Sequence, residues 1–151
     1  AAGLPVAARN PNLHVAAFFH DEAIADLLKA HCPHAECLLP MSIELLVRTA
    51  NDPGSSRVPK TLLSTLVSPT LYSVTVPERG LQFAFGNVFR ALKRHHHATA
   101  LGVSAGQTNE PLTLNPPDDR AVQSGDILYY MADRRISASA LDWDAIAQET
   151  D

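Results

Sequence analysis

The hydrophobic positions in the first fifty residues follow two alternating patterns. A short, nearly continuous apolar run over residues 13–20 is typical of a strand buried on both faces, and a second short run covers residues 35–40. After each run, apolar residues recur at helical spacing, with Asp21 and Ser42 in the positions of helix caps. The order strand, helix, strand, helix predicts parallel strands joined by crossover helices.

The pattern changes again in the middle of the chain. Turn residues at 51–56 precede a further helical stripe that ends near residue 68, where we place the boundary between two lobes. Residues 70–77 alternate at period two, as in a half-buried strand, and residues 81–96 return to helical spacing. Gly86 falls inside this predicted helix, where a glycine costs about 1 kcal/mol.

Short strands dominate the rest of the chain. We expect strands at residues 98–105, 112–114 and 126–132, with a hairpin loop at residues 106–110 between the first two. A weakly patterned helix follows from Ser137. The second lobe is therefore predicted to combine several strands with one well-patterned helix.

Composition excludes several classes of function. The chain has 151 residues, of which 46% are apolar, and this is enough for a real core. It has 12 basic and 16 acidic residues, a net charge of −4 and no basic stripe, so we expect no nucleic-acid partner. No apolar run approaches the roughly 20 residues that cross a bilayer.

The N-terminal segment and the cysteines indicate a compartment. The first ten residues lack the basic and apolar regions of a secretion signal, and they also lack a starting Met, so we expect a piece of a longer protein. Two cysteines provide no disulfide framework, which fits a reduced cytosolic setting.

Two turns near the C-terminus carry the most information. Asn115, Pro116 and Pro117 stop a short strand, because paired prolines lock φ and cannot donate to a strand ladder. Gly125 and Asp126 belong to a second turn, in which the glycine can take a positive φ. Between these turns we expect the chain to pass round the end of a sheet.

The segment LNPPDDRAVQSGDILYYM, residues 114–131, resembles the C-terminal lobe of RCK domains, the regulators of potassium conductance. Residues 10–54 resemble the closing part of the Rossmann-like N-lobe of these domains, and residues 71–80 resemble the strand that opens the C-lobe. The resemblance covers residues 10–132, which is almost the whole chain.

The resemblance implies both a fold and a function. The implied fold is α/β, with a partial Rossmann-like parallel sheet and helices over residues 1–68 and a small mixed α+β C-lobe over residues 69–151. The implied function is not enzymatic: it is that of a cytoplasmic gating domain of a potassium channel or potassium transport system, which self-associates as a homodimer or ring. The pore would lie upstream in the chain or on a separate subunit, which places the domain at the inner face of the cell membrane. A regulatory tail of another ion transporter or antiporter fits the same resemblance.

The chain departs from a complete RCK N-lobe at the nucleotide site. Such a lobe binds nucleotide through a G-x-G-x-x-G turn, whereas Gly3, Gly54 and Gly80 each stand alone. We therefore expect no nucleotide binding by this chain alone, and we assign it no cofactor. A nucleotide or a divalent cation is left as a ligand of the parent protein.

Asp21 and Glu22 directly follow the first predicted strand. The carboxyl ends of strands face the ligand crevice of an open α/β sheet, so both acids are candidate ligands for a cation. In the RCK family, which the chain resembles, calcium-responsive members carry carboxylates in about this region. The alternative is a helix cap at Asp21, with Glu22 in the first turn, where the helix dipole favours an acid.

Four residues of zinc-ligand type lie close together in the first lobe. They are His31, Cys32, His34 and Cys37, and their spacing differs from that of zinc fingers and ribbons. A turn with buried thiols is the alternative to a metal site. A small α/β metal-binding protein or enzyme that uses this cluster is the alternative function.

The remaining candidates lie on the long helix predicted in the second lobe. His95, His96 and His97 follow two basic residues at its C-terminal end, where cations complement the dipole and where a pH sensor is the alternative. Phe85 and Phe89 belong either to the core or to a subunit interface. The sequence has no G-x-S-x-G and no H-E-x-x-H motif, so we expect no catalysis.

Overall fold

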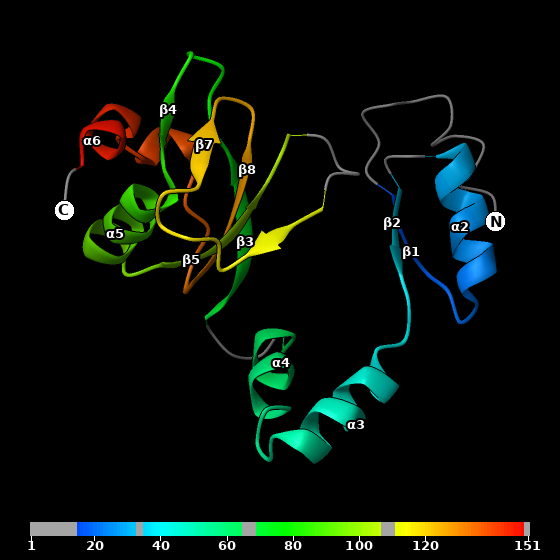
Figure 1. The fold of residues 1–151 in the computed structure, drawn as a ribbon. Helices are drawn as coiled ribbons and strands as arrows, with labels where there is room; N and C mark the ends of the chain where they lie inside the picture. The colour runs from blue at the N-terminus through cyan, green and yellow to red at the C-terminus, as the bar shows by residue number, and fades with distance from the viewer. Residues whose placement is uncertain (1–14, 33–34, 65–68, 107–110, 150–151) are drawn as a thin grey trace. The chain divides into compact units, whose positions relative to one another are not determined.

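Figure 1 shows the fold as a computed structural model that describes residues 15–32, 35–64, 69–106 and 111–149. Contacts divide the chain into two compact units, Ala1–Arg57 and Val58–Asp151, and each is described by itself. The lobe boundary predicted at residue 68 and most of the predicted hairpin loop, residues 107–110, lie outside the described residues.

The N-terminal unit contains a two-stranded parallel sheet. β1 (Val15–Phe18) pairs with β2 (Ala35–Leu38) in parallel register. α2 (Glu22–His31) forms the crossover between the two strands, and α3 (Ser42–Asn51) follows β2. The predicted order of strand, helix, strand, helix is confirmed.

The two helices of this unit begin in different ways. Asp21 caps α2, because its Oδ1 accepts the N–H of Ala23 at 2.9 Å, and the helix ends at the C-cap Cys32. α3 has Met41 as its N-cap, with no side-chain hydrogen bond at the cap. Ser42 is already the first helical residue, so the predicted Ser42 cap is wrong by one position.

The parallel strands are buried on one face only. On the covered face, Ala35 and Cys37 pack with Leu28 of α2. On the opposite face, Phe18 is 56% exposed and Leu38 is 50% exposed. The predicted burial on both faces is wrong, because α2 covers one side of the sheet and the other side stays open in the described part of the chain.

The C-terminal unit contains two antiparallel sheets (Figure 1). The larger sheet has the strand order β3-β8-β5-β6, and the smaller one pairs β4 with β7. The strands are β3 (Thr70–Thr75), β4 (Gln82–Ala84), β5 (Thr99–Ser104), β6 (Thr113–Leu114), β7 (Ala121–Gln123) and β8 (Ile127–Ala132). The helices are α4 (Arg57–Leu62), at the division between the units, α5 (Phe85–His96), the 3-10 helix η1 (Ala138–Ala140) and α6 (Trp143–Gln148).

One hydrophobic core connects α5, α6 and the two sheets of the C-terminal unit. α5 contributes Val88 and Leu92, and β8 contributes Leu128 and Tyr130, all fully buried. The Tyr130 hydroxyl accepts the N–H of Ile136 at 2.7 Å and donates to the carbonyl of Ile136 at 3.1 Å. These bonds fix the chain that leads from β8 to η1 against the core.

Helix α5 is shorter than the sequence predicts. Gln82–Ala84 forms β4, which pairs with β7, and the helix begins at Phe85. Gly86 is therefore the second residue of α5 and not an interior residue. A Cβ at this position would lie 3.0 Å from the Cβ of Asp118, so the close approach of the loop before β7 favours glycine.

Candidate regulatory site

The predicted turn at Gly125 and Asp126 is hydrogen-bonded to the residue that follows β3, directly before β8 begins. Gly125 has a φ of +86°, in the region that favours glycine, as predicted. Its N–H donates to the carbonyl of Val76 at 2.9 Å, and the N–H of Val76 donates to the carbonyl of Asp126 at 2.8 Å. The buried Asp126 carboxylate accepts the N–H of Gln123 at 3.0 Å. Asp126 is thus a structural group of the turn.

The predicted turn at Asn115, Pro116 and Pro117 ends β6. Asn115 has a φ of +46° and donates its N–H to the carbonyl of Leu101 at 2.7 Å. Pro116 is buried and Pro117 is exposed. The chain therefore leaves the edge of the sheet after β6, and the buried side chain of Pro116 packs inside the fold.

The loop after these prolines caps helix α5. The carbonyl of Asp118 accepts the N–H of Gly86 at 2.9 Å. The carbonyl of Arg120 accepts the N–H of Phe85, also at 2.9 Å. Because the loop already occupies the first N–H groups of the helix, this end of α5 is not an open anion site.

Asp21 and Glu22 lie at the carboxyl end of β1, where the sequence predicts them. Asp21 acts as the N-cap of α2, and Glu22 is in the first turn of that helix. Both residues are exposed. The structure thus contains the predicted helix cap, and the cation site stays a prediction.

The cysteines of the predicted metal cluster are packed in the N-terminal unit. Cys32 is buried beside Leu28, and the Sγ of Cys37 lies 3.7 Å from the carbonyl oxygen of Ala25, to which it donates. The Nδ1 of His31 lies 2.8 Å from the carbonyl oxygen of Leu27, in the same helix. His34 lies outside the described residues. Among the residues that are described, no three His, Cys, Asp or Glu side chains are placed to hold a metal ion together.

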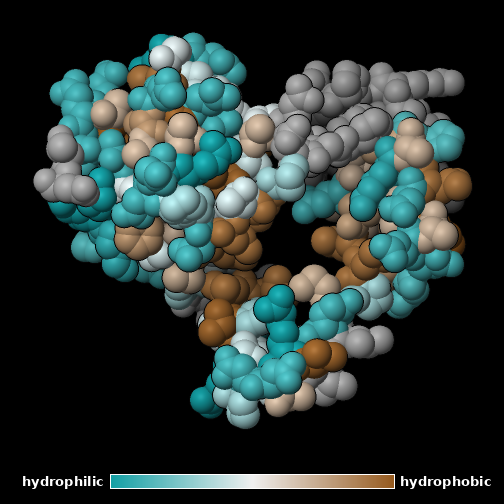
Figure 2. Space-filling model, viewed as in Figure 1, coloured by the Kyte–Doolittle hydropathy of each residue, from teal (hydrophilic) through white to brown (hydrophobic). Residues whose placement is uncertain are grey.

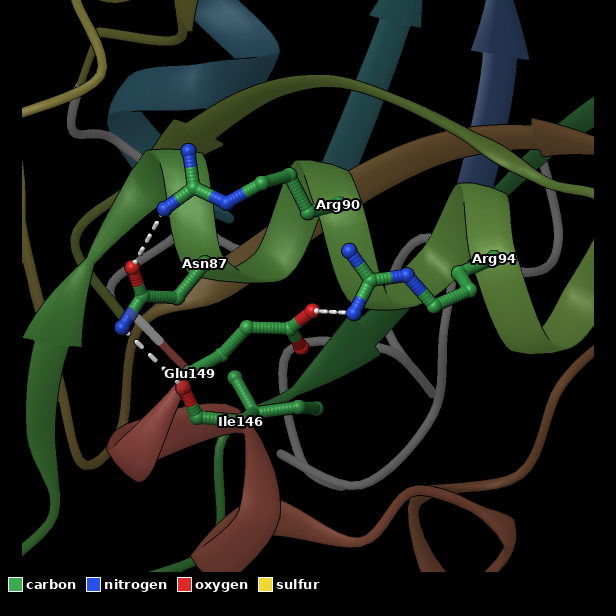
Figure 3. Close-up of polar contacts among 5 residues, drawn as sticks. All are labelled: Asn87, Arg90, Arg94, Ile146 and Glu149. Carbon is green, nitrogen blue, oxygen red and sulfur yellow. Dashed lines mark hydrogen bonds and ion pairs between the residues drawn. The ribbon is translucent and has the colours of Figure 1, made fainter. Parts of the chain in front are cut away.

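The contact between α5 and α6 was not predicted from the sequence (Figure 3). Asn87 of α5 is buried and donates from Nδ2 to the carbonyl of Ile146 at 3.1 Å. Arg90 donates from Nη2 to the Oδ1 of Asn87 at 3.0 Å. Further along α5, the Nη1 of Arg94 lies 2.6 Å from the Oε1 of Glu149. The one local signal for this contact is an asparagine among the apolar positions of α5.

The histidine cluster lies at the C-terminal end of α5, as predicted. His95 and His96 are in the last turn, and His97 ends the helix with a φ of +54°. Burial, and secondly the charge of neighbouring His95, lower the pKa of His96, because both disfavour its protonated form. A pH-sensing role for the cluster stays a prediction.

The two phenylalanines of the predicted interface lie in different environments. Phe85 is 3% exposed and belongs to the core of its own unit. The prediction that it contributes to an interface is therefore wrong, because its surface is already covered. Phe89 is 41% exposed and stays a candidate for an interface.

Comparisons with known proteins bear on the fold. No family model and no curated protein matches the chain. The structure of the human SLO3 gating ring matches with a TM-score of 0.58 and 11% identity, over 80% of this chain and 26% of that chain. The GsuK channel matches with a TM-score of 0.40 and 12% identity, over 97% of this chain and 24% of that chain. The GsuK RCK domain matches with a TM-score of 0.39 and 11% identity, over 97% of this chain and 31% of that chain.

The chain has an RCK-like fold. At 11% identity the likeness to the gating ring concerns the fold alone. The chain spans about a quarter of the length of that gating-ring chain, 26%. Among the described residues of this RCK-like fold, no helix is both long and apolar enough to cross a membrane.

Proposed function

We propose that this chain is part of the cytoplasmic regulatory domain of a potassium channel or potassium transport system, and that it has no catalytic activity. The observation that carries the proposal is the likeness of its fold to a gating ring over 80% of the chain. The resemblance of residues 114–131 to an RCK C-lobe is independent support, because it rests on sequence motifs. The pore lies upstream in the parent chain or on a separate subunit, and the domain acts at the inner face of the membrane.

Gating in this role requires two shapes of an RCK assembly that differ in their affinity for a ligand. A ligand shifts such an equilibrium only by the difference between its binding free energies in the two shapes. A coupling of about 1–3 kcal/mol is useful for regulation. We propose a divalent cation at Asp21 and Glu22 as this ligand, because both acids are exposed and follow β1.

The N-terminal unit supports self-association as a homodimer or ring. Figure 2, viewed as in Figure 1, shows hydrophobic residues at the surface of the unit that contains α2. The large exposed apolar residues of this unit are Phe18, Ile24, Leu27, Leu38, Met41 and Val47. Phe18 and Leu38 are partners on the open face of the sheet, and Ile24 and Leu27 are exposed on α2. Neighbouring exposed apolar side chains of this kind are typical of a protein–protein interface.

Light scattering over a concentration series tests the proposal on the whole chain. We expect a dimer or a larger assembly, whose mass falls toward that of the monomer when Leu27→Glu places a carboxylate among the exposed apolar residues. Leu27 is 68% exposed, so this change leaves the fold of α2 in place. A strictly monomeric wild-type chain at high concentration would contradict the proposed assembly.

A matched variant distinguishes the loss of apolar surface from an added charge. Ala30→Glu adds the same carboxylate at another exposed position of α2 without removing a large apolar side chain. We expect this variant to assemble nearly as well as the wild type. Equal dissociation of both variants would mean that charge alone controls the assembly.

A further inference from the structure

A cleft of about 330 Å³ opens in the C-terminal unit between α5 and the segment from η1 to α6. Ala91, Leu141 and Ile146 form an apolar wall, and all three are buried. Small-molecule sites occupy roughly 300–1,000 Å³ and combine apolar walls with a few polar groups. The cleft therefore has the size and lining for a compact organic molecule.

The polar rim of the cleft is asymmetric. His95 and His96 line the side of α5, and Asp142 and Glu149 line the side of α6. The Oδ1 of Asp142 accepts the N–H of Ala145 at 3.0 Å, which holds this carboxylate in place. A carboxylate has about four acceptor sites, and this hydrogen bond uses one of them. Both acidic residues line the cleft, and the Oε1 of Glu149 is already bound to the Nη1 of Arg94 at 2.6 Å.

The charge that favours a positive ligand at this cleft is the carboxylate of Asp142. The carbonyls at the C-terminal end of α5 carry a partial charge of about −0.5, whereas the N-terminal end of α6, capped by Asp142, carries a partial positive charge. Arg94 offsets the negative charge of Glu149 through their ion pair of 2.6 Å. Lys93 is exposed in the same turn of α5. The lowered pKa of His96 limits the positive charge that α5 adds within the cleft.

We propose that this cleft binds a small organic cation, an ammonium or guanidinium group on a compact apolar body. The apolar body packs against Leu141 and Ile146, and the cationic group donates a hydrogen bond to the carboxylate of Asp142. A metal ion fits less well, since the described residues contain no group of three His, Cys, Asp or Glu that could hold one. Binding at this cleft does not depend on the proposed gating role.

Three alanines that line the cleft permit a direct test on the whole chain. They are Ala91, Ala140 and Ala145, and their labelled methyl groups report binding by NMR. Benzylammonium, benzyl alcohol and benzoate serve as probes of similar size and different charge. We expect saturable shifts of the three methyl resonances with benzylammonium, at an affinity about tenfold or more above that for benzoate. Benzoate binding as tightly as benzylammonium, or no saturable shift at these methyls, would overturn the proposal.

A pair of variants tests whether the carboxylate of Asp142 binds the cation. Asp142→Asn removes the charge from the rim and keeps the helix cap, since Asn caps helices about as well as Asp. We expect it to weaken benzylammonium binding about tenfold. Asp144→Asn is the matched control, because Asp144 is exposed on the same helix and does not line the cleft. Equal losses in the two variants would assign the effect to net charge and overturn the role of Asp142.

Discussion

The two units of the chain differ in how completely each one buries its own apolar residues. The C-terminal unit closes a core in which Leu92, Leu128 and Tyr130 are fully buried. The N-terminal unit buries a small cluster around Leu28 and leaves Leu27, its neighbour on the same helix, 68% exposed. Among the described residues of this unit, two strands and the helix that covers them bury too little surface for independent stability. We infer that the C-terminal unit is self-sufficient and that the N-terminal unit depends on further protein surface.

Separating the units should give the largest effect. We expect residues 58–151 alone to unfold cooperatively and to give a dispersed NMR spectrum, because this unit keeps its whole core. We expect residues 1–57 alone to lack a stable fold, with amide exchange close to that of an unfolded chain. Cooperative thermal unfolding of residues 1–57 in isolation would remove the contrast between the two units.

Two Leu→Ala changes test the same contrast within the intact chain. Leu92→Ala opens a cavity in the core of the C-terminal unit and should lower the free energy of unfolding by about 2–5 kcal/mol. Leu27→Ala removes an exposed side chain and should change it by no more than about 0.5 kcal/mol at concentrations where the chain is monomeric. Urea unfolding followed by circular dichroism measures both. Comparable losses would show that Leu27 is part of a core after all.

Features that depend on neighbouring residues could be predicted from the sequence. The cap at Asp21 depends on an N–H two residues away, and the positive φ at Gly125 depends on the turn that contains it. The alternation of apolar residues in β3 gives its buried and exposed faces. These elements follow from local geometry, and the sequence contains all of that information.

Features that depend on distant partners could not be predicted in this way. β4 and β7 are three residues long and exist through their pairing with each other, while the apolar positions of residues 81–92 also fit a helix. Asn87 and Arg94 contact α6 across more than fifty residues, so no local spacing signals the contact. Phe18 has the sequence pattern of a doubly buried strand, although the described part of the chain covers one face only.

The smallest predicted effect concerns the pH dependence of the C-terminal unit. Burial and His95 lower the pKa of native His96 below its ordinary value of 6.5, so the unfolded chain binds this proton more readily. The unfolding free energy of the unit therefore has its full value above pH 6.5, where His96 is neutral in both states. It decreases as the pH falls through the lowered native pKa of His96. His96→Gln should therefore weaken the dependence of the unfolding free energy on pH in mildly acidic solution.

The direction of this change decides between two groups of neighbours. His95 and the loss of hydration oppose protonation of His96, whereas the carboxylates of Asp142 and Glu149, which line the same cleft, favour it. If the effect of the carboxylates on the pKa of His96 were the larger one, acidification would stabilise the unit. His96→Gln would then remove an increase in the unfolding free energy at low pH instead of a decrease. His20→Gln is the control, because His20 is exposed in the N-terminal unit and its replacement should leave the pH profile of the C-terminal unit unchanged.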